Sequence, residues 1–225
     1  NIVILTGAGI SAESGIKTFR DSDGLWENYS IEEVATFDAW QRNPKLVLDF
    51  YNQRRRQLLT CEPNDAHQQL VKLEDKYNVQ IITQNVDDLH ERAGSATILH
   101  LHGELLKVRS TLDENLIYEW HSDLNIGDKC QKGAQLRPHI VWFGEQVPMM
   151  AIAEKIASKA DIFIVIGSSL VVYPAAGLIH YTDFTVPKYV IDPNRPTLSN
   201  IQNTEYITEK ASIGVRKLVD RLLAE

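Results

Sequence analysis

Cysteine is scarce in this chain of 225 residues, which contains only Cys61 and Cys130. Two thiols cannot complete a four-cysteine metal site, and these two are too far apart in the sequence for a C-x-x-C pair. The chain also opens on a strand-like segment and not on a signal-like one. Since few thiols and no secretory pattern are typical of a reducing compartment, we expect a cytoplasmic protein.

Long hydrophobic runs and an excess of positive charge are missing as well. No apolar run reaches the roughly 18 residues that a membrane-spanning helix requires, so we expect no membrane segment. The 30 acidic residues outnumber the 23 basic ones, which gives a net charge of −7. The run Arg54-Arg55-Arg56 is short and is typical of a solvated helix face. We therefore expect no nucleic-acid partner.

What the sequence does contain is an alternation of strands and helices. Continuous apolar runs rich in Val and Ile predict strands buried on both faces, at Ile2–Leu5, Val79–Thr83, Asp161–Ile166 and Lys188–Ile191. Helical patterns lie between them, at Ala66–Lys76, Met150–Lys159 and Ile213–Leu223. This alternation predicts an α/β fold, a Rossmann-like parallel sheet with helices on both faces.

Two stretches interrupt the alternation and predict a small inserted lobe. Residues 21–60 look mostly helical, whereas residues 107–137 are polar, rich in turns and short of apolar periodicity. We expect the two insertions to meet in space within a single domain of residues 1–225. Its Rossmann-like lobe would comprise residues 1–20, 61–106 and 138–225, and its small lobe residues 21–60 and 107–137.

The first predicted strand runs into a glycine-rich turn of the pattern G-x-G-x-x-A, formed by Gly7, Ala8, Gly9, Ile10, Ser11 and Ala12. Small residues in such a turn let the backbone approach a pyrophosphate, whose charge lies at the N-terminus of the following helix. An ordinary tight turn between strand and helix fits the pattern too. A dehydrogenase is disfavoured, because no second strand ends in an acidic residue about twenty positions later.

A polar cluster of Gln84, Asn85, Val86 and Asp87 follows the predicted strand Val79–Thr83. Ligands of open α/β sheets bind at the carboxyl ends of the strands, where this cluster would lie. A helix N-cap at Asn85 or Asp87 is the simpler interpretation for one residue, but it does not account for the whole run.

Three further segments carry patterns that fit a site. His100 and His102 precede a glycine, and either could be a general base, although a lone histidine is more often structural. Residues 137–145 are extended and apolar, and fit either a strand that pairs with a peptide or a core strand. The strongest predicted strand is followed by Gly167, Ser168 and Ser169, where phosphate or ribose hydroxyls could meet small residues.

Together these motifs resemble the sirtuin family. The family's order and spacing are kept by GAGISAESGIKTFRD, TQNVDDLH, HGE, RPHIVWFGE and GSSLVVYPAA, and the likeness covers essentially the whole chain. The resemblance implies an NAD-dependent protein-lysine deacylase whose partners are acylated-lysine proteins or peptides. In the family's reaction the acyl oxygen attacks the nicotinamide ribose, and nicotinamide and 2′-O-acyl-ADP-ribose are released.

The resemblance also implies the roles of particular residues. His102 aligns with the family's catalytic histidine, a general base, and Asn85 and Asp87 complete the catalytic set. Phe19 would shield the reactive carbon from water. An acyl-lysine tunnel would be lined by Val141 and Phe143, and the peptide backbone would be held by Gly144 and Glu145. The positions implied to bind the cofactor are Gly7, Ala8, Gly9, Ile10, Ser11, Ala12, Ile16, Phe19, Arg20, Trp26, Gln84, Asn85, Val86, Asp87, Gly167, Ser168, Ser169, Asp192, Pro193, Asn194 and Ala211.

Tyr51 and Arg54 resemble the Y-x-x-R signature of class III sirtuins, which include the bacterial CobB type. Their spacing puts both on one face of a helix, where a phenol and a guanidinium could hold a carboxylate at the end of an acyl chain. A surface Tyr and Arg on an amphipathic helix would show the same spacing. With the resemblance, we expect a desuccinylase or demalonylase activity beside deacetylation.

Two departures from the family are visible. Sirtuins usually hold a structural zinc with four cysteines, but here residues 108–110 contain none and residues 129–132 only Cys130. His121 and His139 show no ligand spacing, so we predict no zinc and expect residues 107–137 to be the least stable part. At the adenosine ribose, Asp192 stands where the family usually has Asn, and its carboxylate can still accept from ribose hydroxyls.

Three rival functions remain at this point. The same cofactor site could serve NAD hydrolysis or ADP-ribosyl transfer, although neither needs a peptide clamp or the Tyr51/Arg54 pair. A non-catalytic NAD-sensing module is a second rival, which the retained His102, Asn85 and Asp87 argue against. A dehydrogenase comes last, for want of the ribose acid. We expect a monomer.

Overall fold

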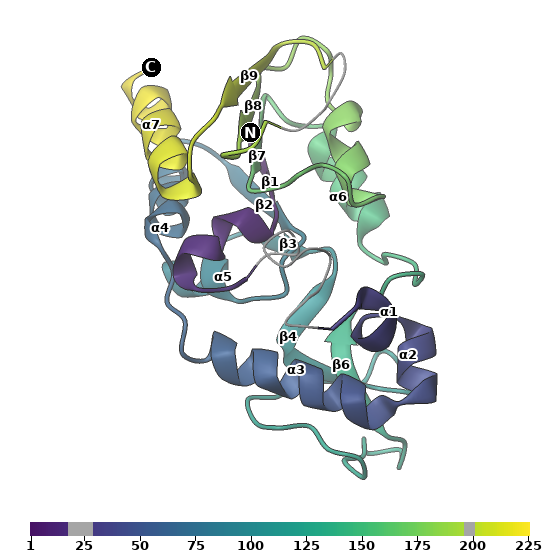
Figure 1. The fold of residues 1–225 in the computed structure, drawn as a ribbon. Helices are drawn as coiled ribbons and strands as arrows, with labels where there is room; N and C mark the ends of the chain where they lie inside the picture. The colour runs from purple at the N-terminus through teal and green to yellow at the C-terminus, as the bar shows by residue number, and fades with distance from the viewer. Residues whose placement is uncertain (18–28, 196–200) are drawn as a thin grey trace.

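The computed structural model describes residues 1–17, 29–195 and 201–225 of the chain. The main sheet consists of parallel strands in the order β3-β2-β1-β7-β8-β9 (Figure 1). Because Thr6 of β1 pairs with Thr83 of β2 and with Ile166 of β7, these strands end level with one another. The bounds are β1 Ile2–Thr6, β2 Val79–Thr83, β3 Ile98–His100, β7 Ile162–Ile166, β8 Lys188–Ile191 and β9 Thr204–Ile207.

Helices cover both faces of the main sheet, which confirms the predicted α/β class. Ile2 and Ile4 of β1 pack on one face, in a cluster with α4 Asp65–Lys72, η3 Leu73–Asp75 and α7 Ala211–Ala224. Val3 and Leu5 pack on the other face, in a cluster with α6 Met150–Ala157 and the 3-10 helix η4 Ala175–Tyr181. This two-sided burial is the reason for the uninterrupted apolar run of β1.

All four predicted strands are present, and β3 and β9 are found in addition. Both extra strands lie at an edge of the main sheet and are only partly buried. An edge strand needs no continuous apolar run, which explains why neither was predicted.

The glycine-rich pattern implied a helix directly after the turn, and this expectation is wrong. Two 3-10 turns follow β1 instead, η1 Ala8–Ile10 and η2 Ala12–Ser14. Gly9 and the serines of this segment are poor helix formers, and Gly15 ends the second turn with φ +91°. A pyrophosphate at this turn would therefore meet donors of a loop and not the N-terminus of a long helix.

A separate antiparallel sheet with the order β5-β4-β6 forms the small lobe together with three helices (Figure 1). Leu48 of the third helix packs against Val108, Leu124 and Cys130 of the second insertion. The elements are α1 Ile31–Val34, α2 Phe37–Arg42, α3 Pro44–Leu58, β4 Gly103–Ser110, β5 Ile117–Glu119 and β6 Leu136–Ile140.

Hydrogen bonds also join the two insertions. The side chain of Asn52 on α3 donates to the carbonyl oxygen of Leu124 over 3.0 Å and accepts from its N–H over 2.9 Å. Strands β4 and β6 run across the lobe bounds expected at 106/107 and 137/138, so the residue-level division into lobes stays a prediction. Within the three described ranges, no helix has the length and apolar character that crossing a membrane requires.

Candidate active site

The loops after β1, β2, β7 and β8 lie at the carboxyl edge of the main sheet. Gly7, Gln84, Gly167 and Asp192 each come directly after the last residue of one of these strands. The order of the strands reverses between β1 and β7, and α/β sheets bind ligands outside such a switch point. The structure thus brings these four predicted cofactor positions to one edge.

Gly9 and Gly167 bring the loops after β1 and β7 into backbone contact. The N–H of Gly9 donates to the carbonyl oxygen of Gly167 over 2.9 Å. A Cβ atom on Gly9 would lie 2.6 Å from Cα of Gly167, whose own φ is +62°. These glycines therefore allow two protein loops to pack closely against each other. This packing role is separate from the approach of a ligand to the glycine-rich turn.

A buried polar cluster joins the loop after β1 to the loop after β2. The Ser11 hydroxyl donates to Oδ2 of Asp87 over 2.9 Å and accepts from Nδ2 of Asn85 over 3.1 Å. Burial raises the pKa of Asp87 to about 6, against hydrogen bonds from Ser11 and from the Leu89 N–H that lower it. Two residues predicted for catalysis thus share one contact with a residue predicted for the cofactor.

Gln84 and Val86 tie the loop after β2 to its surroundings. Nε2 of Gln84 donates to the Ser168 hydroxyl over 3.1 Å, and the Gln84 N–H donates to the Thr6 carbonyl over 2.9 Å. The Val86 carbonyl accepts from the N–H of Leu105 on β4 over 2.8 Å. The loop is therefore fixed to both halves of the main sheet and to the small sheet.

His102 has the geometry of a general base. Its Nδ1 lies 3.0 Å from the carbonyl oxygen of Gln84. Because a carbonyl only accepts, Nδ1 carries the ring proton, and Nε2 keeps a lone pair that can take a proton. Burial lowers the pKa of His102, which favours this neutral form at neutral pH.

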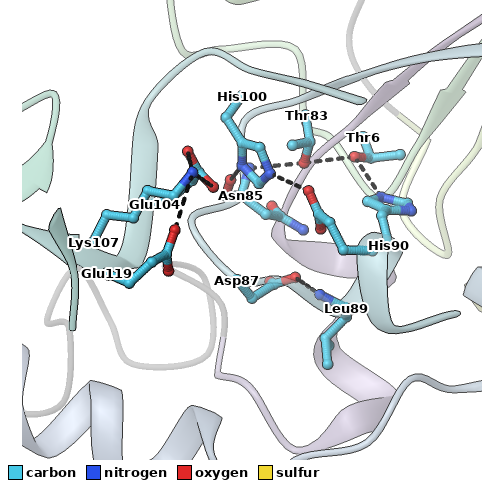
Figure 2. Close-up of polar contacts among 11 residues, drawn as sticks. Thr6, Thr83, Asn85, Asp87, Leu89, His90, His100, Glu104, Lys107 and Glu119 are labelled. Atoms are coloured by element: carbon cyan, nitrogen blue, oxygen red, sulfur yellow. Dashed lines mark hydrogen bonds and ion pairs between the residues drawn. The ribbon is translucent and has the colours of Figure 1, made fainter. Parts of the chain in front are cut away.

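His100 is held in the opposite way. Its Nδ1 lies 3.1 Å from the carbonyl oxygen of Asn85 (Figure 2), and its Nε2 lies 2.7 Å from Oε1 of Glu91. Glu91 belongs to α5 Leu89–Ala93. Burial opposes a charge on this ring, but the hydrogen bond and the charge of Glu91 outweigh it and raise the pKa of His100. The geometry thus separates two histidines that residue type and spacing left equivalent, and it agrees with the resemblance, which favoured His102 as the base.

A second buried network lies beside these residues (Figure 2). The Thr6 hydroxyl donates to Oγ1 of Thr83 over 2.8 Å and lies 3.1 Å from Nε2 of His90. The Asn85 N–H donates to the same Thr83 oxygen over 3.0 Å. Sequence reasoning gave these residues no role, although two neighbouring apolar strands that both end in threonine are a visible signal.

The segment after β6 carries the predicted substrate residues. The Val141 N–H donates to the His102 carbonyl over 2.9 Å, and the side chain of Phe143 is 42% exposed. Gly144 turns the chain with φ +87°. The Glu145 carboxylate accepts from Arg137 over 2.8 and 3.0 Å and from the Trp142 N–H over 2.8 Å. Glu145 therefore stabilises the turn that presents Phe143.

Tyr51 and Arg54 lie on α3, and both are buried. Nε1 of Trp142 donates to the Tyr51 hydroxyl over 3.0 Å, which connects this helix to the segment of Val141 and Phe143. Burial raises the pKa of Tyr51, so the phenol stays protonated and can donate a hydrogen bond. Both residues are thus buried and not on the surface, and Tyr51 contacts the neighbour of the predicted tunnel residues Val141 and Phe143.

The loop after β8 and the start of α7 lie at the other end of this edge. Asp192 is 5% exposed, and its Oδ1 accepts from the N–H of Asn194 over 2.8 Å, across Pro193. Glu13 of η2 accepts from the N–H of Ser212 over 3.0 Å and from its hydroxyl over 2.8 Å. This contact fixes the beginning of α7, with Ala211, against the glycine-rich loop.

The other predicted cofactor positions fall into three groups. Ile10 and Ile16 are buried in core clusters, so their side chains serve packing. Ala8 and Ala12 begin the two 3-10 turns, and Ser169 comes after Ser168 in the loop after β7. The remaining predictions, Phe19, Arg20 and Trp26, lie outside the described residues.

No group of three or more His, Cys, Asp or Glu side chains that could hold a metal occurs in the part of the chain that the structure describes. Cys130 is buried among the apolar residues of the small lobe. Its N–H donates to the Ala134 carbonyl over 2.8 Å in a tight turn. The absence of zinc stays a prediction.

Fold and site together define a dinucleotide-binding α/β protein with a neutral histidine and a buried carboxyl group at its switch point. More narrowly, the chain belongs to the Sir2 family, whose model matches residues 7–174. A similar protein of Helicobacter pylori, called NAD-dependent protein deacylase, is 56% identical over 99% of this chain and 95% of its own length. One of the same name from Bacteroides thetaiotaomicron is 51% identical over 99% and 98%.

Solved structures agree with this membership. A Sir2 homologue in complex with NAD superposes with a TM-score of 0.90 at 41% identity, over 99% of this chain and 89% of that one. A Sir2 variant with a deacetylated p53 peptide and 3′-O-acetyl ADP ribose gives 0.82 at 32% identity, over 98% and 92%. These likenesses confirm the Rossmann-like fold with its small lobe.

Proposed function

We propose that this protein is an NAD-dependent protein-lysine deacylase that releases nicotinamide and 2′-O-acyl-ADP-ribose. The observation that carries the proposal is His102, whose Nδ1 is bound to the Gln84 carbonyl while Nε2 keeps its lone pair. Through this bond His102 contacts the loop that carries Asn85 and Asp87. Relatives 50–56% identical bear the name NAD-dependent protein deacylase, which supports the same reaction here.

NAD supplies the reaction with an activated ribose carbon and with nicotinamide as leaving group. The chain's own residues fit such a cofactor at its nicotinamide end. Asn85 and Asp87 offer an amide and a buried carboxyl group, fixed by Ser11, where a carboxamide and a ribose could be bound. His102 would take a proton from a ribose hydroxyl, and the burial of Asn85 and Asp87 would keep water away from this end.

The adenosine end is supported by a pattern that spans β7 and β8. Gly167 comes after β7, and Asp192 after the neighbouring parallel strand β8. In dinucleotide sites, a glycine after one strand and an acid after the next, about twenty residues later, serve the pyrophosphate and the ribose hydroxyls. The acid that is missing in the first half of the sheet is thus present in the second half, and we assign it to the adenosine ribose.

The acyl-lysine substrate would be bound by the segment 141–145. The N–H groups of Val141 and Phe143 donate to the carbonyls of His102 and Ala35, which fixes this segment, and the exposed Phe143 before the turn at Gly144 offers an apolar wall for a peptide. Glu145 would act by holding this turn through Arg137. The relative of known structure that contains a deacetylated peptide supports a protein substrate.

Among acyl groups, we propose that succinyl and malonyl are accepted beside acetyl. Tyr51 and Arg54 lie on one side of α3, and the Tyr51 hydroxyl is tied to Trp142, the neighbour of the wall residues Val141 and Phe143. A protonated phenol and a guanidinium are donors that suit a terminal carboxylate.

The test is to incubate the protein with NAD and matched acetyl-, succinyl- and malonyl-lysine peptides and to identify the products by mass spectrometry. Deacylated peptide, nicotinamide and acyl-ADP-ribose in equal amounts are expected. Nicotinamide with free ADP-ribose and unchanged peptide would contradict deacylation and favour an NAD hydrolase. ADP-ribose attached to the peptide would favour an ADP-ribosyltransferase.

A further inference from the structure

We propose that His100 is a positioning residue. Its ring stays protonated at neutral pH and fixes the main chain of Asn85, and through Asn85 the catalytic loop after β2. This role rests on the proposed function, because it concerns the same reaction. His100 would touch neither cofactor nor substrate. It would act through Asn85.

The charge of His100 is set by its two partners. Nδ1 lies 3.1 Å from the Asn85 carbonyl oxygen and Nε2 lies 2.7 Å from Oε1 of Glu91. Both oxygens are acceptors without a proton to give, so each ring nitrogen must donate. A neutral imidazole has a single N–H, and only the protonated ring can make both bonds. The His100 side chain is 10% exposed, whereas that of Glu91 is 40% exposed, so the ring is shielded from solvent while its acidic partner lies nearer the surface.

The bond to the Asn85 carbonyl acts on the whole catalytic loop. The Asn85 side chain donates to the Ser11 hydroxyl, and that hydroxyl donates to Asp87. Figure 2 shows His100 above Asn85, with Asp87 on the same loop. If the carbonyl of Asn85 loses its donor, the peptide unit can rotate, and both catalytic side chains lose their alignment with His102.

The charged groups that face His100 favour the cation. Glu91 on α5 and Glu104 on β4 both raise the pKa of His100. Lys107 on β4 is itself paired with Glu104 at 2.7 Å. Asp87 in the loop after β2 is a further acid close enough to interact with the His100 charge.

The other histidine close to His100 adds no competing charge. Burial keeps the pKa of His90, also on α5, well below its usual value, so His90 stays neutral when His100 is charged. His102 is neutral for the same reason. A cation and a base therefore coexist two residues apart on the chain.

This arrangement predicts the pH dependence of the reaction. As pH falls, His102 gains a proton below its usual range, and the base is lost. As pH rises, His100 loses its proton above its usual range, and a ring with one N–H leaves an acceptor oxygen facing a lone pair. The profile of kcat/KM would be bell-shaped, with His102 and the carboxyl group of Asp87, whose pKa is about 6, on the acidic limb and His100 on the basic limb.

The test compares pH profiles of kcat/KM for the wild type, Glu91→Gln and His100→Gln, with NMR titration of the histidine ring protons. Removing the Glu91 charge lowers the pKa of His100, so the basic limb should move down by about one pH unit or more. His100→Gln should lack this limb and lose kcat more than it changes KM. Glu62→Gln is the matched control, since Glu62 pairs with Arg92 of the same helix at 3.0 Å and does not touch His100.

Each outcome decides the matter. Movement of the basic limb together with the NMR pKa of His100 supports the role. A limb that stays in place in Glu91→Gln, while the NMR pKa of His100 falls, overturns it and leaves the deacylase intact. An NMR pKa of His100 in the wild type that lies below the ordinary histidine value of about 6.5 also overturns it. A wild type that does not deacylate any peptide overturns the proposed function first, and this role with it.

Discussion

The Ser11 hydroxyl lies 2.9 Å from Oδ2 of Asp87, and this hydrogen bond joins the loops after β1 and β2 at the candidate active site. It helps to hold a carboxyl group whose pKa burial has raised to about 6. At neutral pH the protein therefore keeps a buried charge that favours unfolding. Such a cost is expected where function, and not stability, selects the residue.

Asp87→Asn should stabilise the protein and abolish deacylation. Burial raises the pKa of Asp87 from 3.8 to about 6. The folded protein therefore loses stability as the pH rises from the unfolded pKa of 3.8 to the folded pKa of about 6, because the carboxyl group must then ionise in a buried place. An amide removes this cost and keeps an acceptor for Ser11, but its nitrogen cannot accept the 3.3 Å bond from the Leu89 N–H, which predicts a net gain of about 1–2 kcal/mol at about pH 8. Urea unfolding measures it.

At about pH 4 most of that gain should vanish, because the carboxyl group is then protonated in the folded state. Asp220→Asn, at an exposed site on α7, serves as the control and should leave the unfolding free energy unchanged. If Asp87→Asn is less stable than the wild type at about pH 8, the charge of Asp87 does not destabilise the folded protein.

Gly9→Ala should damage both the fold and the binding of NAD. The new Cβ would meet backbone of Gly167 at 2.6 Å, and backbone cannot move aside as a side chain can. We expect the free energy of unfolding to fall by about 2–3 kcal/mol, and we expect calorimetry to detect no binding of NAD. Gly177→Ala is the control, because its Cβ would meet only the Tyr173 ring at 3.8 Å. Equal stability of the two variants would contradict the loop contact.

Asp192 should set the preference for NAD over NADP. A buried carboxylate can accept from ribose hydroxyls, whereas it repels a 2′-phosphate. Calorimetry should show NAD bound at least tenfold more tightly than NADP by the wild type, since one repelled charge is worth about 1.4 kcal/mol or more. Asp192→Asn should narrow this ratio, and Asp220→Asn should not. If the ratio of NAD to NADP affinity is the same in Asp192→Asn as in the wild type, Asp192 does not bind the adenosine ribose.

Arg54→Met should change the choice of acyl group more than the rate of acetyl removal. Loss of one charged donor to a carboxylate costs about 1.5–3 kcal/mol, which predicts at least a tenfold fall in desuccinylation relative to deacetylation. The control is Arg56→Met on the same helix, where Arg56 is exposed and pairs with Asp123. If Arg54→Met lowers both activities in equal proportion, Arg54 does not select the acyl group.

The sequence predicted those parts of the fold whose signal is local. β1 and β2 are apolar throughout because helices bury both faces, and that pattern is visible without a structure. β9 at the edge lacks it, as do β4 and β5 of the small sheet, so these strands were not predicted, whereas β6 overlaps the extended segment expected at residues 137–145. The helix expected after Gly9 was wrong because the G-x-G-x-x-A pattern specifies a turn and not the type of the next element.

The candidate site divides in the same way. Residue types, their order and the family resemblance predicted Asn85, Asp87 and His102 as site residues, but the contacts of these residues depend on strand register, which pairs Thr6 with Thr83. The opposite protonation of His100 and His102 depends on where α5 places Glu91. No local pattern contains that information.

The most direct measurement compares His102→Ala with the wild type on NAD and an acetyl-lysine peptide, quantifying nicotinamide and deacetylated peptide by mass spectrometry and NAD binding by calorimetry. General-base catalysis contributes about 100-fold or more to a rate. We expect the wild type to form both products in equal amounts, and His102→Ala to bind NAD normally while deacetylation falls by about 100-fold or more. Deacetylation by His102→Ala within about threefold of the wild type would show that His102 is not the base.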